Sequence, residues 1–599
     1  MFSRKFSSNI QRRKRMVLTS LILLVVFLGI GYSAFSTDLG INGILKVNKY
    51  EEKIYWALQD NDNDSINETL VLSSEEVNGV EKGNFLPNTT FDSTSQVPWI
   101  ETGAFQYDST SNKSYNVTTV NIEKEISPTS TANWFYGVGY NAPTFIVNLE
   151  KLNTSQIKNM TSMFSYAGYT ATTWDIGDLS EWNTSGVTSM KSMFEKAGYN
   201  STTFDLDLSE WNTSEVTNMT SMFAYAGHSA TTWSIGDLSE WNTSKVKSIG
   251  HMFEEAGYNA SAFDIGNLNE WDTSNVNEMI YTFNSAGYNA TTWNIGDLSN
   301  WNTSQVVTME WMFFNAGCKA TTWDIGNLDN WNTSNVTNME RLFQSGYNAT
   351  TWNIGDLSDW NTSKVTKMSC MFAGGDNATV FNIGNLDNWD TSQVKNMWAM
   401  FSGGKSATTW NVGDLSGWDT SQVTDMSSMF NNAGKNATAW DVGDLSNWNT
   451  SKVRYMNDMF SSAGYKATTW DVGDLSNWNI SQVTSIYEMF SYAGYSATTF
   501  NLNLSGWDTS QVTKMEKMFS SAGYNATTFN LNLSGWNTSK VTDMSSMFKN
   551  AGNNATTFSI TIPRTNGNGI NNDTTHMYGS TSSTYASPPD SRTFTLATS

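Results

Sequence analysis

The sequence predicts an α/β repeat protein, a solenoid of about 14 strand-turn-short-helix coils with a parallel sheet. A unit of 29 to 30 residues recurs over residues 148–558, and each unit carries a Trp followed twelve residues later by a Phe. A period of this size is typical of stacked units that bury their apolar faces only against their neighbours. The Trp landmarks are Trp182, Trp211, Trp241, Trp271, Trp301, Trp331, Trp360, Trp389, Trp418, Trp448, Trp478, Trp507 and Trp536.

Each unit opens with a pattern that predicts a short strand. In one copy, residues 172–176 are β-branched and aromatic and alternate in character, which places Trp174 and Ile176 on the face expected to be buried. Parallel strands lie about 4.8 Å apart, so successive copies are expected to build one sheet along the stack.

A stripe with helical spacing follows the strand. Val187, Met190, Met193 and Phe194 stand at i, i+3, i+6 and i+7, which predicts one apolar helical face. The Asn-Thr-Ser run at 183–185 precedes the stripe where an N-cap belongs, and Gly198 follows it where a left-handed residue ends a helix. Because helices pack about 8 to 10 Å apart, the helical side is expected to splay and the stack to curve.

The two ends of the chain break the pattern. Six Lys and Arg residues lie in the basic, cytoplasmic segment 1–15, and residues 16–35 carry no charge. Such a stretch spans a bilayer core of about 30 Å, and both a retained transmembrane signal-anchor and a signal peptide cleaved near Ser36 stay open. Residues 37–147 and 559–599 are expected to cap the solenoid, with β-strands near 53–59, 68–73 and 592–597.

Charge and cysteine content narrow the function classes. The formal net charge is −22, with six of the 34 basic residues before residue 16, so the exported part repels nucleic acid. Cys318 and Cys370 occupy different repeat positions, so two unpaired thiols are expected.

The repeat resembles that of BspA-like leucine-rich-repeat surface proteins of bacteria. Asn183-Thr184-Ser185-x-Val187 and Met193-Phe194 recur with few substitutions over about 410 residues. What the resemblance implies is a curved leucine-rich-repeat-like solenoid at the cell surface, with a family role in attachment to host or neighbouring-cell components. The chain departs from the shorter repeat common in that family through an extra Ala-Gly-Tyr-Asn-Ala-Thr-Thr loop.

The loop after each predicted helix holds the candidate ligand-binding residues. One position is Tyr in eight units, and Asp376 and Lys405 replace it elsewhere, which indicates that it faces solvent. Aligned tyrosines offer a large contact area at low entropic cost, although a ladder that only stacks on itself would look the same. The candidates are Tyr169, Tyr199, Tyr258, Tyr288, Tyr347, Tyr465, Tyr495 and Tyr524.

Metal binding finds weak support. Asp60, Asp62 and Asp64 resemble half a calcium loop, but Ser65 stands where Gly is needed and Val71 where a bidentate Glu belongs. A hairpin turn rich in Asn and Asp is favoured there. Asp or Asn also recurs after each strand, as at Asp178, which fits a turn preference better than a metal ligand. We therefore predict no metal and no cofactor.

Catalysis is not expected. The three histidines are His228, His251 and His576, none beside a Cys or Ser in a nucleophile setting, and we identified no cluster of unique polar residues that interrupts the repeat. The Trp landmarks could form a sugar-stacking ladder, but their constancy favours a place in the core. The expected function is a non-enzymatic, membrane-anchored or secreted surface adhesin that binds a host or bacterial surface protein or glycan; the alternative is a passive stalk or shield.

Overall fold

The computed structural model describes residues 52–100, 114–562 and 593–596. The predicted membrane segment 16–35, the basic segment before it and His576 lie outside these residues. Within them, we find no helix that has both the length and the apolar character needed to cross a bilayer.

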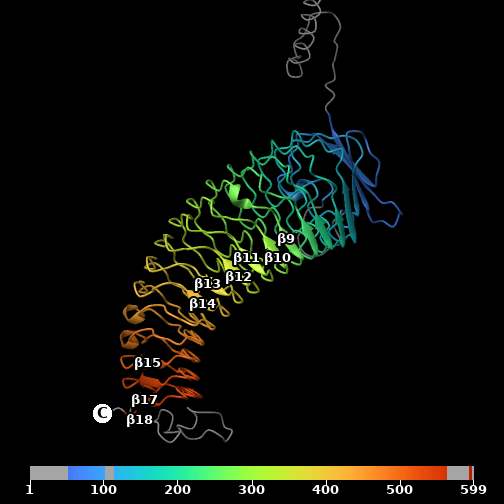
Figure 1. Cartoon of the computed structure of the whole chain (residues 1–599). Helices are drawn as coiled ribbons and strands as arrows, with labels where there is room; N and C mark the ends of the chain where they lie inside the picture. Colours follow the sequence, from blue (N-terminus) through green and yellow to red (C-terminus); the bar gives the residue numbers. More distant parts are fainter. Residues whose placement is uncertain (1–51, 101–113, 563–592, 597–599) are drawn as a thin grey trace, which may run out of the picture. The chain divides into compact units, whose positions relative to one another are not determined.

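The described part is a β-solenoid whose coils follow one another in chain order (Figure 1). A six-stranded sheet, in the order β3-β1-β2-β4-β5-β6, opens it with β1 (Ile54–Gln59), β2 (Thr69–Ser73), β3 (Glu81–Phe85), β4 (Thr119–Ile122), β5 (Thr144–Asn148) and β6 (Thr173–Asp175). Four parallel pairs follow: β7 (Thr203–Asp205) with β8 (Thr232–Ser234), β9 (Ala262–Asp264) with β10 (Thr292–Asn294), β11 (Thr322–Asp324) with β12 (Thr351–Asn353), and β13 (Val380–Asn382) with β14 (Thr409–Asn411).

A four-stranded parallel sheet ends the described stack. It comprises β15 (Thr499–Asn503), β16 (Thr528–Asn532), β17 (Thr557–Ile562) and β18 (Thr593–Leu596). Four short 3-10 turns complete the elements: η1 (Thr94–Gln96), η2 (Leu268–Glu270), η3 (Leu445–Asn447) and η4 (Leu475–Asn477). Strands lie near the three cap positions expected from the sequence, and β1 and β2 form an antiparallel hairpin.

A short strand matches the prediction in most coils, but the coils of Trp440 and Trp470 have none, and the strands form several sheets instead of the single sheet expected. Thr173–Asp175 pairs in parallel with the preceding strand, and Trp174 and Ile176 are buried. Thr173 and Asp175 alternate with them and are exposed. The period-two pattern therefore identified the inward face correctly.

The predicted helix is wrong. The segment after Val187 is a run of tight turns in which Ser192 and Lys196 have left-handed backbone, with φ of 53° and 55°. The N–H groups of Met193 and Ala197 donate three residues back, to Met190 and Phe194, over 3.2 and 3.0 Å. The described residues contain almost no helix, and the same two turn positions carry left-handed residues in most coils.

Hydrogen bonds between coils replace those that a helix would make within itself. Alternate N–H groups of the turn run donate to carbonyls of the next coil. They belong to Met190, Ser192, Phe194 and Lys196, and the distances are 3.1, 2.9, 2.8 and 2.7 Å. Beyond its first turn, an α-helix sends each N–H four residues back and leaves none for a neighbour. The apolar stripe is still buried, so the spacing of Val187, Met190, Met193 and Phe194 located the core but not the backbone.

The residues predicted to cap the helix have other roles. Asn183 accepts hydrogen bonds from the N–H and hydroxyl of Ser185 at 3.1 and 2.7 Å, which closes a local Asx turn. The buried Thr184 hydroxyl donates to the Asn212 carbonyl in the next coil at 3.0 Å. Gly198 is left-handed, as predicted, and a β-carbon there would lie 2.8 Å from Cγ of Trp174.

The core is one continuous cluster of buried residues from Ile54 to Ile560. The landmark Trp side chains belong to it, as predicted, and each from Trp211 onward donates its indole N–H to a Leu carbonyl of the preceding coil, for example Trp271 to Leu238 at 2.9 Å. The Phe rings of neighbouring coils also stack. This stacking begins before the first predicted repeat, since Phe135 stacks on Phe164 with ring centroids 5.3 Å apart. The stack has about 15 coils.

Neighbouring coils diverge from one side to the other. For one pair of coils, the ring centroids are 4.7 Å apart at Tyr258 and Tyr288, 5.4 Å at Phe253 and Phe283, and 6.3 Å at Trp241 and Trp271. The rings in each pair are nearly parallel, and their centroid distances increase in this order. The longest of these ring distances is at the landmark Trp position and not at the Phe of the segment where helices were expected.

Substitutions at Ser428 distinguish the left-handed turn from a helix. Ser428 has φ of 55°, so Ser428→Gly is expected to raise the free energy of unfolding by up to about 1 kcal/mol, and Ser428→Val to lower it by about 1 to 2 kcal/mol. In a helix, Gly would cost about 1 kcal/mol instead. Urea unfolding of the full chain measures both; a loss on Ser428→Gly would contradict the turn.

Candidate functional site

The tyrosine position forms a ladder of stacked rings along one edge of the coils. From Tyr140 to Tyr288 each ring lies on the next, with centroid distances of 4.5 to 4.7 Å and planes within 15°. His228 takes one place in this series, between Tyr199 and Tyr258. A second series joins Tyr465, Tyr495 and Tyr524 at 4.4 and 4.7 Å.

The ladder tyrosines are half-buried, which qualifies the expectation of a solvent-facing position. Each ring covers a face of its neighbour, so the outer edge is the part that a partner could contact. Burial raises the pKa of Tyr199 and Tyr258 above the usual value for a phenol, with Glu255 adding to the shift in both. These groups are therefore neutral donors near pH 7.

Between the two series the ladder changes chemistry. Cys318 follows Tyr288, and after Tyr347 come Asp376 and Lys405, whose side chains pair at 2.8 Å. Tyr347 thus stands apart from the other seven candidates, and its pKa is raised chiefly by burial. The three coils here lack one residue of the turn run, which explains why their small residues Gly374 and Gly403 pack backbone to backbone.

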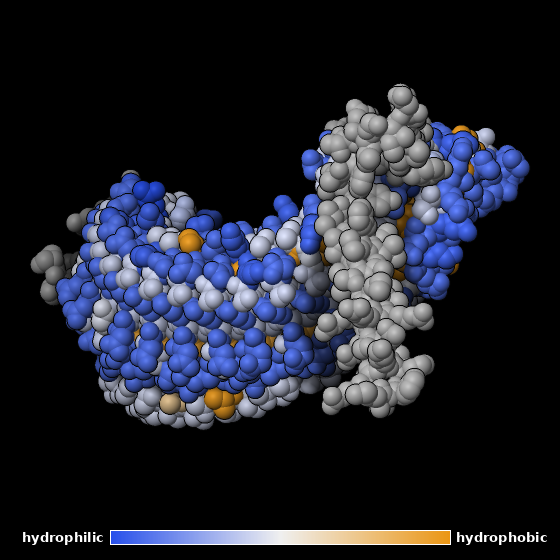
Figure 2. Space-filling model, turned by 90° about the horizontal axis from the view of Figure 1, so that it is seen from above, coloured by the Kyte–Doolittle hydropathy of each residue, from blue (hydrophilic) through white to orange (hydrophobic). Residues whose placement is uncertain are grey.

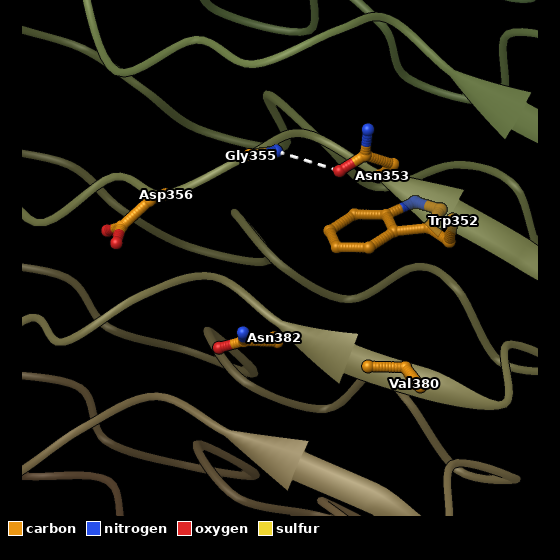
Figure 3. A pocket seen from close by; sticks show the side chains of 6 residues that line it. All are labelled: Trp352, Asn353, Gly355, Asp356, Val380 and Asn382. Carbon is orange, nitrogen blue, oxygen red and sulfur yellow. Dashed lines mark hydrogen bonds between the residues drawn. The ribbon is translucent and has the colours of Figure 1, made fainter.

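A shallow pocket of about 320 Å³ lies on the strand face between β12 and β13 (Figure 3). It is lined by Trp352, Asn353, Gly355, Asp356, Val380 and Asn382. In several strand pairs the Asn at this position donates directly to the equivalent residue of its neighbour, as Asn411 does to Asn382 at 2.9 Å. Among the described contacts, Asn353 and Asn382 make no such bond across the pocket, and β12 and β13 belong to separate sheets. Amide and carboxylate groups on a partly apolar floor suit a small polar ligand but offer no nucleophile.

The acidic loop between β1 and β2 is the predicted hairpin turn. Carboxylate oxygens of Asp60, Asp62, Asp64 and Glu68 lie within 4.8 Å of one another. They accept hydrogen bonds from the loop backbone, for example Asp60 from the N–H of Ser65 at 2.9 Å. The acidic residue after each strand acts likewise: Asp178 accepts from the N–H of Ser180 at 2.9 Å, which lowers its pKa.

The cysteines and the two described histidines make no catalytic arrangement. Cys318 and Cys370 are buried and unpaired, as expected; Cys370 lies in a left-handed turn and not on a helix. His228 contacts Glu255 at 3.2 Å and His251 contacts Glu254 at 2.7 Å, each with its ring on an aromatic neighbour. Among the described residues neither imidazole contacts a Ser or Cys side chain.

One cluster of unique residues escaped the sequence analysis. The left-handed position two residues before each landmark Phe is Ser in several coils, but four successive coils carry His251, Tyr281, Trp311 and Arg341 there. These residues substitute within one column and leave the repeat period unchanged, and the sequence analysis did not single that column out. Aligning the copies on the Phe and reading that one column would have revealed the cluster.

Comparison with known proteins places the repeat in a family. Seven overlapping segments match the family described as "Mycoplasma protein of unknown function, DUF285": 116–231, 168–290, 228–324, 317–440, 375–494, 405–522 and 465–585. Curated proteins include none that matches the chain. Since the matches together cover well over half of the sequence, the chain belongs to the DUF285 family.

Proposed function

We propose that the chain is a non-enzymatic surface protein whose solenoid attaches to a protein or glycan of a host or neighbouring cell. Membership of a repeat family and the resemblance to BspA-like leucine-rich-repeat surface proteins support this proposal. The apolar stretch 16–35 would anchor the chain in the membrane, or direct its secretion if cleaved, with the solenoid outside.

The observation that carries the proposal is the contrast between constant inward positions and one recurrent outward column. The Trp, Val and Phe landmarks are buried in coil after coil, whereas the ladder position varies among Tyr, His, Cys, Asp, Lys and Asn. A fold that needed only stability would not need aromatic rings at an edge where Asp376 and Lys405 also fit. Stacked tyrosines present repeated, equally spaced contacts, so weak individual sites give avidity.

The surface favours a polar partner over insertion into lipid. The face shown in Figure 2 is mainly hydrophilic, in rows that run along the stack, with small and separate hydrophobic spots. Aromatic edges with phenol donors suit a protein or a glycan, because both offer polar groups beside apolar surface.

Replacement of two ladder tyrosines tests the adhesin. Beads coated with the full chain are allowed to attach to epithelial or bacterial cell layers. With the variant Tyr258→Ser/Tyr288→Ser, the number of attached beads is expected to fall several-fold, because two adjacent contacts are lost together. The far-UV spectrum should not change, since the column also accepts Asp and Lys. Tyr455→Ser removes a tyrosine that is 53% exposed outside the ladder and serves as the matched control.

The passive stalk predicts a different pattern. If the ladder variant and Tyr455→Ser both attach like the unmodified chain, and deletion of four internal units also leaves attachment intact, the repeats do not bind the cell surface. They then serve only as a stalk that displays the end segments. Equal losses in the ladder variant and in Tyr455→Ser would indicate general surface stickiness and would also count against the ladder.

A further inference from the structure

Five planar side chains form a continuous stack on the turn edge of the middle coils. We define the turn-edge cluster as His251, Tyr281, Trp311, Arg341 and Trp398. The ring centroids of the first three are 5.0 and 5.4 Å apart in succession, with planes within 15°. The Arg341 guanidinium lies 4.5 Å from the centroid of the Trp311 ring and 5.6 Å from that of Trp398.

The fold does not require these side chains. Ser192, Ser221 and Ser428 hold the same left-handed turn in other coils, and bulky residues are disfavoured in that region of backbone space. Trp398 comes from a coil two beyond that of Arg341, and the intervening coil carries only the small Cys370 and Ala373. Trp398 is 38% exposed, so the end of the stack is open to solvent.

Negative charge surrounds the turn-edge cluster. Glu254, Glu278, Glu310 and Glu340 belong to the same coils, where Arg341 contacts Glu340 and Lys367 acts on Glu310. His251 is paired with Glu254 at 2.7 Å, and Arg341 is shared between Glu340 at 4.0 Å and Gln344 at 3.0 Å. Burial and the neighbouring Glu340 raise the pKa of Glu310, and Lys367 opposes them.

Arg341 shows which group this surface accepts. Its guanidinium is bracketed by two indole rings, lies 5.3 Å from the Phe314 ring, and reaches a carboxylate and an amide oxygen. Aromatic faces beside carboxylates are the usual setting for guanidinium and ammonium groups. The same chain repeats the arrangement with Lys196, which lies 4.8 and 5.0 Å from the rings of Tyr166 and Tyr225.

We propose that the turn-edge cluster docks a basic peptide segment of a partner protein, with its Arg or Lys head groups paired with the glutamates and their alkyl chains along the outer edges of the Tyr281, Trp311 and Trp398 rings. The inference rests on the proposed function, because it names a partner class for a surface protein. It concerns a different column of the repeat from the tyrosine ladder, with different side chains, so each can fail without the other.

Binding of a fluorescently labelled Arg- and Lys-rich peptide to the full chain, followed by anisotropy, tests the proposal. Tyr281→Ser/Trp311→Ser installs the residue that other coils use and keeps every formal charge, and it is expected to weaken the peptide Kd at least tenfold. Asp458→Ser/Glu488→Ser changes the same column outside the cluster and removes two negative charges. It should leave the Kd within about twofold.

The outcomes separate specific docking from general attraction to an acidic protein. Equal affinity of both variants for the peptide, or a greater loss in Asp458→Ser/Glu488→Ser, would overturn the cluster as the site. An acidic peptide or a neutral oligosaccharide that binds the full chain as tightly, with the same loss in Tyr281→Ser/Trp311→Ser, would overturn the partner class. The bead-attachment assay with the ladder variant is independent of both results.

Discussion

Replacement of Trp301 by Ala is expected to lower the free energy of unfolding by about 3 to 5 kcal/mol. The side chain is 1% exposed and lies between Trp271 and Trp331, with ring centroids 6.2 and 6.3 Å away. Its indole N–H donates to the Leu268 carbonyl at 2.8 Å. Ala would leave a cavity in the continuous core and remove that bond between coils.

Urea unfolding of the full chain and limited proteolysis measure the effect together. In a stack each coil depends on its neighbours, so a weakened coil should also become the first point of cleavage. Trp398→Ala is the matched control, because that indole is 38% exposed and outside the core; a cost of about 1 kcal/mol or less is expected. Similar losses for the two tryptophans would contradict the assignment of the landmark Trp to the interior.

Gly317→Ala is expected to cost about 2 to 5 kcal/mol. Gly317 has φ of +53°, where a β-carbon costs about 1 to 2 kcal/mol, and that carbon would lie 2.5 Å from Cγ of Trp293. Overpacking of a well-filled core adds about 1 to 3 kcal/mol. Thermal unfolding of the full chain, compared with the unmodified protein, measures the change.

Gly417→Ala provides the control for this glycine. Gly417 has no positive φ, and its nearest atom to an added β-carbon is the Asp387 carbonyl oxygen at 3.8 Å. Glu181 and Asn300 hold the same place in other coils, so the change should be neutral or stabilise by a few tenths of a kcal/mol. Comparable destabilisation by Ala at both glycines would show that close packing against Trp293 is not the cause.

Local pattern was sufficient for the strand and for the identity of the core. Alternation placed Trp174 and Ile176 inward because a pleated strand sends successive side chains to opposite faces. The same reasoning failed after Val187, since a stripe at i, i+3 and i+7 fits a run of tight turns as well as a helix. Hydrophobic spacing reports which side chains are buried and not where the N–H groups donate.

The candidate surfaces also have one part that the repeat pattern predicts and another that depends on the tertiary structure. The repeat period aligned the tyrosines in sequence, and stacking at 4.4 to 4.7 Å follows from placing equivalent residues in adjacent coils. The contact between Arg341 and Trp398 links coils that are not adjacent, so no column of the repeat predicts it. The pocket between β12 and β13 likewise depends on a local break in strand pairing.

By itself, the sequence determined that this chain is a stack of coils and which residues of each coil point inward, because identical units must bury identical positions against one another. Only the tertiary structure decided the backbone of the turn run. There, alternate N–H groups of Met190 to Lys196 find their acceptors in the next coil, and left-handed Ser192 and Lys196 turn the chain so that they can. A helix would have satisfied those groups within itself and left neighbouring coils unbonded along that side.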